Sequence, residues 1–159
     1  MTLISQYEAV YFTCDIRRLP WVREYPLDVV LGSVLDFINK ISTNQSVFLP
    51  SATLSLCNNP DIFDIKLTPS ENMGVIAERY RLEFSEVRSA HPFWSHCGSG
   101  DVARKILSGV QMNAYGAGSV WEKLLECRTL HICIGANLFQ TPSIVHHVEQ
   151  SVGVPYRYT

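Results

Sequence analysis

Residues 27–41 carry apolar side chains at the spacing of an amphipathic helix, and no other segment constrains the fold as strongly. Intervals of three and four residues dominate among the apolar positions, which are Leu27, Val30, Leu31, Val34, Leu35, Ile38 and Ile41. This spacing places them on one helix face, which must pack against a core. The segment lies between two runs typical of buried strands, 8–14 and 46–49. The order strand, helix, strand predicts an α/β fold.

The remaining segments continue this alternation. Residues 51–69 are rich in Asn and Pro and predict a long, irregular loop, a kind of loop that is often functional. A helix should follow, with Ser70 as its N-cap and Tyr80 near its end. Further on, the patterns predict short helices over 101–107 and 120–125 and a strand over 129–134. A final helix, which carries His146, should follow residue 143. Ligands of α/β folds bind at the carboxyl ends of strands, so the loops after the three strands should converge on one crevice.

The composition is that of a globular chain. With 159 residues and 47% hydrophobic content, residues 1–159 suffice for one core and a single domain. A net charge of -2 gives no basic surface for nucleic acid. No apolar run is long enough to span a membrane, and the first residues lack the pattern of a signal peptide.

The five cysteines include no Cys-x-x-Cys pair. An odd number of cysteines without close spacing argues against a disulfide framework and against a structural zinc site. We therefore expect no metal, and we expect a reducing, cytoplasmic compartment.

His146 and Glu149 lie three residues apart, shortly before a Gly-Val-Pro sequence that should end a helix. Residues at this spacing are neighbours on a helix surface, so the carboxylate can hold the imidazole and favour its uptake of a proton. An enzyme that acylates amines needs such a base. A His and a Glu on an exposed helix face are usually only solvated. The pair therefore indicates a catalytic function only together with the other motifs of the chain.

Two loops have backbones suited to a ligand. The loop after the first strand contains Cys14, Asp15 and Ile16 and could cradle a cofactor. The turn from Thr68 to Ser70 precedes a helix, where backbone N–H groups can bind an anionic or polar ligand. The structural alternative for Ser70 is an ordinary helix cap, which is the more common role of such a residue.

Two further segments have weaker signals. The residue before Pro92 is His91, whose backbone is restricted to extended or turn conformations, and Trp94 could form a pocket wall. A packed turn with exposed histidines is about as common. The sequence Gly116-x-Gly118-Ser119 could approach a phosphate or an amide closely, but it is not a dinucleotide fingerprint.

Taken together, these segments resemble the aminoglycoside 3-N-acetyltransferase family. The resemblance runs from about the first strand to the last residue, and five motifs occur in the family's order with near-matching spacing. The motifs are Phe63-Asp64 to Arg81 with Thr68-Pro69-Ser70, Met73-Gly74 and Glu78; Arg88-Ser89-x-His91-Pro92-x-x-Ser95; Gly116-x-Gly118-Ser119; Ser143-x-x-His146-x-x-Glu149; and Gly153-Val154-Pro155-Tyr156-Arg157. The acetyl-CoA signature of the separate GNAT acetyltransferases is absent.

The resemblance implies a layered α/β/α sandwich around a mixed, largely parallel sheet. It also implies transfer of an acetyl group from acetyl-CoA to an amine of an aminoglycoside or a related amino sugar, and hence a role in antibiotic resistance. His146 matches the family's general base and Glu149 the carboxylate beside it. His91 and Ser95 match a segment that lines the active site, which makes His91 a third candidate catalytic residue, and Ser95 could donate to the thioester oxygen.

The resemblance further places the CoA arm near the first loop and near Thr68 and Ser70. A polycationic acceptor should meet acidic side chains, for which Asp64 and Glu78 are candidates, with Trp94 as a wall.

Two departures from the family pattern are visible. The family has His-Ser-Ser-Leu after the first strand, where this chain has Thr13, Cys14, Asp15 and Ile16. An acidic Asp15 would sit poorly near CoA phosphates. Family members also continue well past Arg157, so we expect an incomplete domain with an exposed sheet edge, and therefore possible homo-oligomers. The alternative function is a non-catalytic, truncated remnant that serves as a binding or assembly module.

Overall fold

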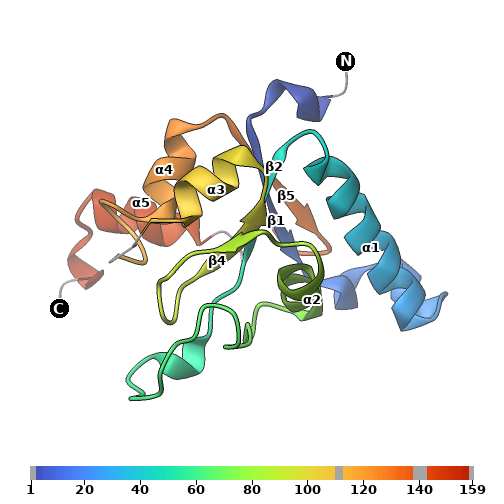
Figure 1. The fold of residues 1–159 in the computed structure, drawn as a ribbon, viewed down its shortest axis with the longest axis horizontal. Helices are drawn as coiled ribbons and strands as arrows, with labels where there is room; N and C mark the ends of the chain where they lie inside the picture. The colour runs from blue at the N-terminus through green and yellow to red at the C-terminus, as the bar shows by residue number, and fades with distance from the viewer. Residues whose placement is uncertain (1–2, 110–112, 138–142, 158–159) are drawn as a thin grey trace.

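The computed structural model describes residues 3–109, 113–137 and 143–157. Within them, five strands form one sheet in the order β3-β4-β2-β1-β5 (Figure 1). The strands are β1 (Ala9–Cys14), β2 (Ser46–Pro50), β3 (Val87–Arg88), β4 (His96–Ser99) and β5 (Thr129–Ile134). The helices are α1 (Leu27–Ser42), α2 (Val75–Glu83), α3 (Asp101–Leu107), α4 (Val120–Glu126) and α5 (Ile144–Ser151). Short 3-10 turns span Leu3–Gln6, Ile16–Arg18, Pro20–Arg23, Leu54–Leu56 and Pro155–Arg157.

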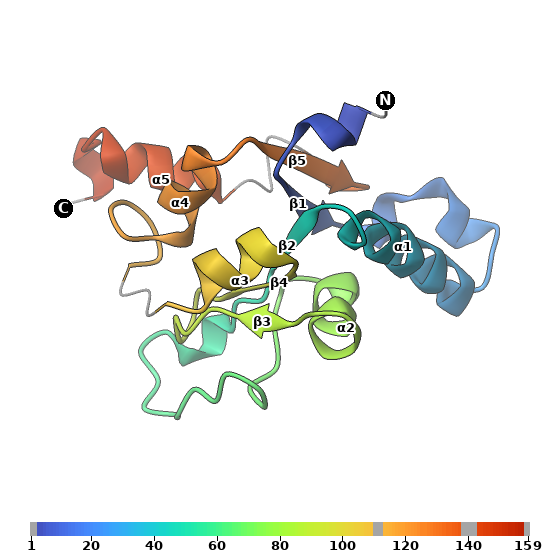
Figure 2. The same cartoon turned by 45° about the horizontal axis from the view of Figure 1, so that its top comes forward.

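The sheet is sandwiched between two helical layers (Figures 1 and 2). Helices α1 and α2 pack on one face, against Val10, Phe12 and Val47. Helices α3 and α4 pack on the other face, against Ala9, Tyr11 and Phe48. Since successive side chains of a strand point to opposite faces, β1 is apolar along most of its length because both of its faces are covered. The layered α/β/α sandwich expected from the sequence is confirmed.

Strand β1 is parallel to both of its neighbours, β2 and β5, whereas β4 is antiparallel to β2 and β3. The sheet is therefore mixed, as expected. Strands β3 and β4 were not predicted, because they are short and surround the His91-Pro92 turn without a clear alternation of apolar residues. Because β1, β2 and β5 are parallel, their carboxyl ends lie at the same end of the sheet, where the chain continues into three loops.

The expectation that Ser70 caps α2 is wrong. The helix begins at Val75, and Gly74 is its N-cap. Asn72 (φ 60°) and Gly74 (φ 87°) both have left-handed backbone conformations, which interrupt any helix that starts earlier. The backbone N–H of Ser70 instead donates to the carboxylate of Glu78, at 2.8 Å.

The segment between β2 and α2 is the long loop that the sequence predicts, and the buried Arg88 holds it in place. The guanidinium donates to the carbonyl oxygens of Ser51 (2.7 Å) and Thr68 and to the hydroxyl of Ser95 (3.0 Å). It also lies 4.9 Å from the ring centroid of Phe63. Burial, with repulsion from the charged Arg81, lowers the pKa of Arg88 to about 10, so the side chain stays charged at neutral pH.

Among the helices in the described part of the chain, none combines the length and the apolar character that crossing a membrane requires.

Candidate active site

A cavity of about 1010 Å³ lies where β1 and β2 end and α2 begins. The end of β1, the start of α2 and the start of α5 all contribute to its wall. The lining residues are Thr13, Cys14, Asp15, Ile16, Arg17, Val22, Leu27, Pro50, Asn72, Met73, Gly74, Val75, Ile76, Trp94, Ser143, Val145 and His146. The carboxyl ends of β1 and β2 meet at this cavity, as expected, whereas Ile134 and Gly135 at the end of β5 line a second cavity instead.

His146 lies on the cavity wall, in the first turn of α5. Its Nδ1 is 3.2 Å from Oε2 of Glu149, one helical turn further on. A carboxylate only accepts hydrogen bonds, so this contact requires the proton on Nδ1 and leaves Nε2 of the neutral ring as an acceptor. The other oxygen of Glu149, Oε1, accepts a hydrogen bond of 2.9 Å from the hydroxyl of Tyr156.

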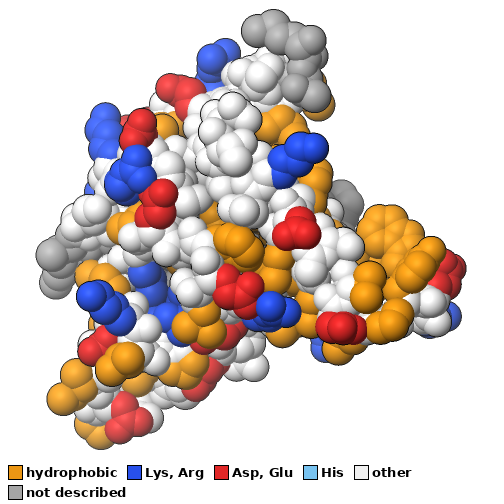
Figure 3. All heavy atoms as spheres, turned by 45° about the vertical axis from the view of Figure 1, so that its right-hand side comes forward, with side chains coloured by type: hydrophobic (Ala, Val, Ile, Leu, Met, Phe, Trp, Pro, Cys, Tyr) orange, Lys and Arg blue, Asp and Glu red, His pale blue; other side chains and the backbone are white. Residues whose placement is uncertain are grey.

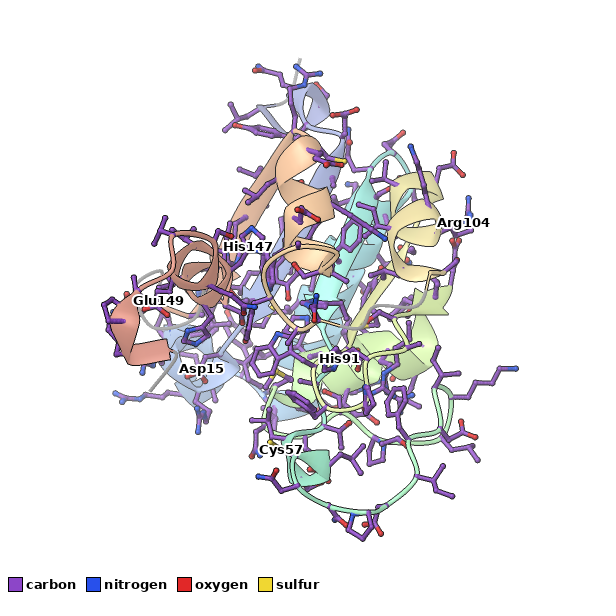
Figure 4. All side chains as sticks on the ribbon, turned by 90° about the vertical axis from the view of Figure 1, so that its left-hand side faces the viewer. Asp15, Cys57, His91, Arg104, His147 and Glu149 are labelled. Carbon is purple, nitrogen blue, oxygen red and sulfur yellow. The ribbon has the colours of Figure 1, made fainter. Side chains whose placement is uncertain are left out.

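The neighbouring histidine, His147, faces the body of the protein, on the other side of α5 from Glu149 (Figure 4). Its Nδ1 accepts a hydrogen bond from the backbone N–H of Gly116 (3.1 Å) and lies 3.3 Å from the hydroxyl of Ser119. Ser119 also caps α4 through its hydroxyl. The Gly116–Ser119 turn, considered above as a ligand-binding turn, thus uses these groups to hold α5.

Aromatic rings form a wall beside His146. The ring of Tyr115 packs edge-on against the His146 ring, with centroids 5.3 Å apart, and lies 5.4 Å from Trp94. Trp94 lines the cavity, and its backbone N–H donates to Nδ1 of His91. Burial lowers the pKa of His91, which keeps that ring neutral.

The loop after β1 brings Cys14, Asp15 and Ile16 to the cavity. Burial, together with the nearby Cys133, raises the pKa of the Cys14 thiol to about 12, so the sulfur is not a nucleophile at neutral pH. Asp15 forms ion pairs with Arg17 (2.8 Å) and Arg18 (3.3 Å). The hydrogen bond from Arg17 lowers the pKa of Asp15, and the two arginines more than balance its negative charge.

Helix α2 begins directly against this loop. A Cβ atom on Gly74 would lie 3.3 Å from the carbonyl oxygen of Cys14, and the φ of 87° is itself unfavourable for other residues. Glycine therefore allows the start of α2 to approach the end of β1. The first N–H groups of a helix lack partners within the helix, so Val75 and Ile76 can offer donors at the cavity.

Two of the expected cofactor residues and one expected catalytic residue are not among the residues that line the cavity. Ser95 is buried, and its hydroxyl donates to the carbonyl of Ser51 at 2.7 Å. The hydroxyl of Thr68 accepts from the backbone of Asp64 at 2.8 Å. His91 is buried beside Phe93.

The remaining expected residues, Ser70 and Asp64 in the long loop and Glu78 on α2, do not line the cavity either. The buried Ser70 hydroxyl has no hydrogen-bond partner among the described residues. Asp64 accepts from the backbone N–H groups of Lys66 and Leu67. Although burial opposes it, hydrogen bonds from Arg81 and Ser70 lower the pKa of Glu78. The structure thus brings Cys14, Asp15, Ile16, Trp94 and His146 to one cavity, with Glu149 held by His146.

Three contributors were not singled out from the sequence: Gly74, Tyr115 and Tyr156. Each occurs in or beside a quoted motif, but a single aromatic residue or glycine gives no spacing signal of its own. Among the described residues, no three His, Cys, Asp or Glu side chains are grouped so as to hold a metal ion.

The family model for aminoglycoside 3-N-acetyltransferases matches residues 39–159, which is more than half of the chain. The chain belongs to this family. The motifs quoted from the sequence therefore identified it correctly. No curated protein matches the chain.

Three solved structures share the fold. The chain superposes on aminoglycoside acetyltransferase AAC(3)-Xa with a TM-score of 0.73 and 17% identity, over 89% of this chain and 54% of that one. For AAC-IIIb bound to CoASH the TM-score is 0.68, with 21% identity over 90% and 58%. For YokD from Bacillus subtilis it is 0.69, with 20% identity over 89% and 62%. The chain thus spans about half to three-fifths of the length of these structures.

Proposed function

We propose that this protein is an acetyl-CoA-dependent N-acetyltransferase that acts on an aminoglycoside or a related amino sugar. The observation that supports this most is the position of His146 on the cavity wall, with Nδ1 at the Glu149 carboxylate. A histidine held in this way carries an unprotonated Nε2, the atom that a general base uses.

The proposed chemistry removes two protons from the acceptor nitrogen. The ammonium first loses one proton to solvent, and the neutral amine attacks the thioester carbonyl carbon of acetyl-CoA while Nε2 of His146 takes the second proton from the nitrogen. The carbon–sulfur bond then breaks, and the imidazolium of His146, stabilised by the charge of Glu149, gives its proton to the leaving thiolate. The products are the acetamide, the CoA thiol and one proton released to solvent.

We place the acetyl group between the loop after β1 and the start of α2. The loop supplies Cys14, Asp15 and Ile16, and the helix supplies unpaired N–H groups near Val75. These donors suit the developing oxyanion better than Ser95, whose hydroxyl proton already goes to Ser51. Support for a CoA ligand comes from AAC-IIIb, a structure of the same fold that holds CoASH.

For the acceptor, we propose that Trp94 and Tyr115 form the wall against which a sugar ring packs. Glu149 is the acidic group in contact with His146. Asp64 and Glu78 would contribute only at a distance, because Asp64 is engaged within the long loop and Glu78 is paired with Arg81 on α2. A structure of the same fold, AAC-VIa, is known with sisomicin bound. His91 would act through Trp94, whose backbone it holds.

The test is release of the CoA thiol from acetyl-CoA, followed with a thiol reagent, against a panel of aminoglycosides and simple amino sugars. Release with any acceptor supports the proposal and identifies the substrate class. A folded sample that binds CoA but releases no thiol with any acceptor overturns it and favours a binding or assembly module. Burial raises the pKa of Cys14 to about 12, so this thiol should add little background, and the exposed thiol of Cys57 is titrated beforehand without acetyl-CoA.

The compartment and the assembly state form part of the same proposal. The five cysteines are all free thiols, which suits a reducing cytoplasm.

Among the described residues, β5 pairs only with β1, so its outer edge is available for a second copy. Beside it lies a second cavity of about 830 Å³, lined by apolar residues that include Trp21, Tyr25 and Phe37. Figure 3 shows hydrophobic side chains exposed on this side of the molecule. Light scattering that gives a monomer mass at all concentrations would contradict self-association.

A further inference from the structure

Helix α5 ends in a Schellman motif. The backbone N–H of Gly153 donates to the carbonyl of Gln150 (3.3 Å), and that of Val154 donates to the carbonyl of Glu149 (3.2 Å). Gly153 has φ 67°, the left-handed conformation that this motif requires and that glycine adopts without strain. The motif reverses the chain, and Pro155 then starts a short 3-10 turn.

The reversal returns Tyr156 to the last turns of α5. Its hydroxyl donates a hydrogen bond of 2.9 Å to Oε1 of Glu149, while Oε2 of the same carboxylate meets Nδ1 of His146 at 3.2 Å. Both oxygens of the Glu149 carboxylate are therefore engaged. Glu149 is itself the residue whose backbone carbonyl takes the Schellman bond, so its side chain and its backbone are fixed by the same turn.

We propose that Tyr156 is a positioning residue for the His146–Glu149 pair, an inference that rests on the proposed function. The terminal torsion of a glutamate is broad, so each hydrogen bond to the carboxylate restricts its rotation. The bond from Tyr156 to Oε1 thereby helps to keep Oε2 directed at His146. The proton of the neutral imidazole is thereby held on Nδ1, and Nε2 is the unprotonated nitrogen that a base requires.

The alternative is that Tyr156 forms an ordinary surface hydrogen bond. Tyr156 is 66% exposed, and many polar contacts between exposed groups contribute little. The two possibilities differ at the imidazole. A surface bond would leave the tautomer of His146 unchanged when it is removed, whereas a positioning bond would not.

The tautomer can be measured directly in the resting protein, without substrate. Long-range proton–nitrogen correlation spectra of protein labelled with nitrogen-15 distinguish a protonated Nδ1 from a protonated Nε2. We expect the Nδ1–H form of His146 to dominate in the wild type. In Tyr156→Phe, which removes only the hydroxyl, the ratio of Nε2–H to Nδ1–H should rise by about threefold to tenfold, the range that one lost hydrogen bond produces.

Two variants complete the comparison. Gly153→Ala puts a side chain at φ 67° and should shift the tautomer ratio in the same direction, by disturbing the turn rather than the hydroxyl. Tyr25→Phe removes the hydroxyl of another exposed tyrosine, for which the described residues provide no hydrogen-bond partner, and should leave the ratio unchanged.

The kinetic result should match the spectra. With an acceptor that is turned over, kcat of Tyr156→Phe should fall by about threefold to tenfold with little change in KM, because the hydroxyl acts through the base. A His146 tautomer ratio in Tyr156→Phe equal to that of the wild type would overturn the inference. If the wild type acetylates no acceptor but Tyr156→Phe still shifts the His146 tautomer ratio, the positioning role stands. That result would count only against the proposed function.

Discussion

The backbone N–H of Gly116 donates a hydrogen bond of 3.1 Å to Nδ1 of His147, and this bond ties the turn before α4 to α5. It gives two adjacent histidines different tasks. His147 is buried and fixes the helix, whereas His146 faces the cavity one residue earlier. The sequence His-His alone does not indicate this division, which depends on which side of α5 meets α4.

Replacement of His147 by alanine should therefore destabilise the fold. It leaves the buried N–H of Gly116 without its acceptor, and an unsatisfied buried polar group costs about 1–3 kcal/mol. Urea unfolding measures the loss. His146→Ala is the matched control, since its side chain is half exposed and its removal should change stability by less than about 0.5 kcal/mol. Equal losses of unfolding free energy in the two variants would contradict the structural role of His147.

Gly74 and Gly32 should respond oppositely to alanine. At Gly74 the backbone lies at φ 87° and ψ 157°, and a Cβ would meet Cys14, so Gly74→Ala should cost about 1–3 kcal/mol. At Gly32, within α1, a Cβ has nothing within 4 Å, so the higher helix propensity of alanine should stabilise by about 0.5–1 kcal/mol. Thermal unfolding of both variants checks this, and a stabilised Gly74→Ala would show that the close approach of α2 is wrong.

Much of the fold could be predicted from the sequence because its elements have clear periodicity. The segment from Leu27 to Ile41 and the strand from Thr129 to Ile134 both appear where their patterns indicate. The short strands β3 and β4 could not be predicted, because two to four residues carry too little alternation. The helix that was expected from Ser70 begins at Val75, because Asn72 and Gly74 have positive φ angles. The residue pattern does not indicate these backbone angles.

The candidate site was predictable in part for a related reason. His146 and Glu149 share one helix, so local spacing alone brings them together, at 3.2 Å. Tyr156 reaches Glu149 only because Gly153 reverses the chain. The hydroxyl of Ser95 forms hydrogen bonds with Ser51 and Arg88, and Ser95 does not line the cavity. Such contacts depend on tertiary structure, which residue spacing does not encode.

Arg88→Lys should loosen the loop between β2 and α2. A single ammonium cannot replace the planar guanidinium that bonds to Ser51, Thr68 and Ser95 together, so at least one buried partner is left unsatisfied at a cost of about 1–3 kcal/mol. Limited proteolysis should show faster cleavage within residues 51–74. Arg79→Lys changes an exposed ion pair and should behave as the wild type. Unchanged cleavage in Arg88→Lys would show that the guanidinium does not hold the loop.

Acid should destabilise the protein through His96. Burial, with the nearby His91, lowers the pKa of His96 to about 3, whereas in the unfolded chain a histidine titrates near 6.5. Between these values the unfolded state binds the extra proton, so stability is full above pH 6.5 and falls by about 1.4 kcal/mol per pH unit down to pH 3. The lowered pKa values of His91 and His131 act in the same direction.

His96→Phe isolates this contribution, because an aromatic ring remains beside Tyr11 and Trp121. Urea midpoints between pH 7 and pH 4.5 should fall less steeply in this variant than in the wild type. Equal slopes in the two proteins would mean that His96 is not the group responsible.

The central claim is that His146 is the base, and the thiol-release rate of His146→Ala tests it most directly. With an acceptor that the wild type acetylates, and with His147 intact to hold α5, we expect the rate to fall at least about a hundredfold while the protein stays folded. A rate close to that of the wild type would contradict the account.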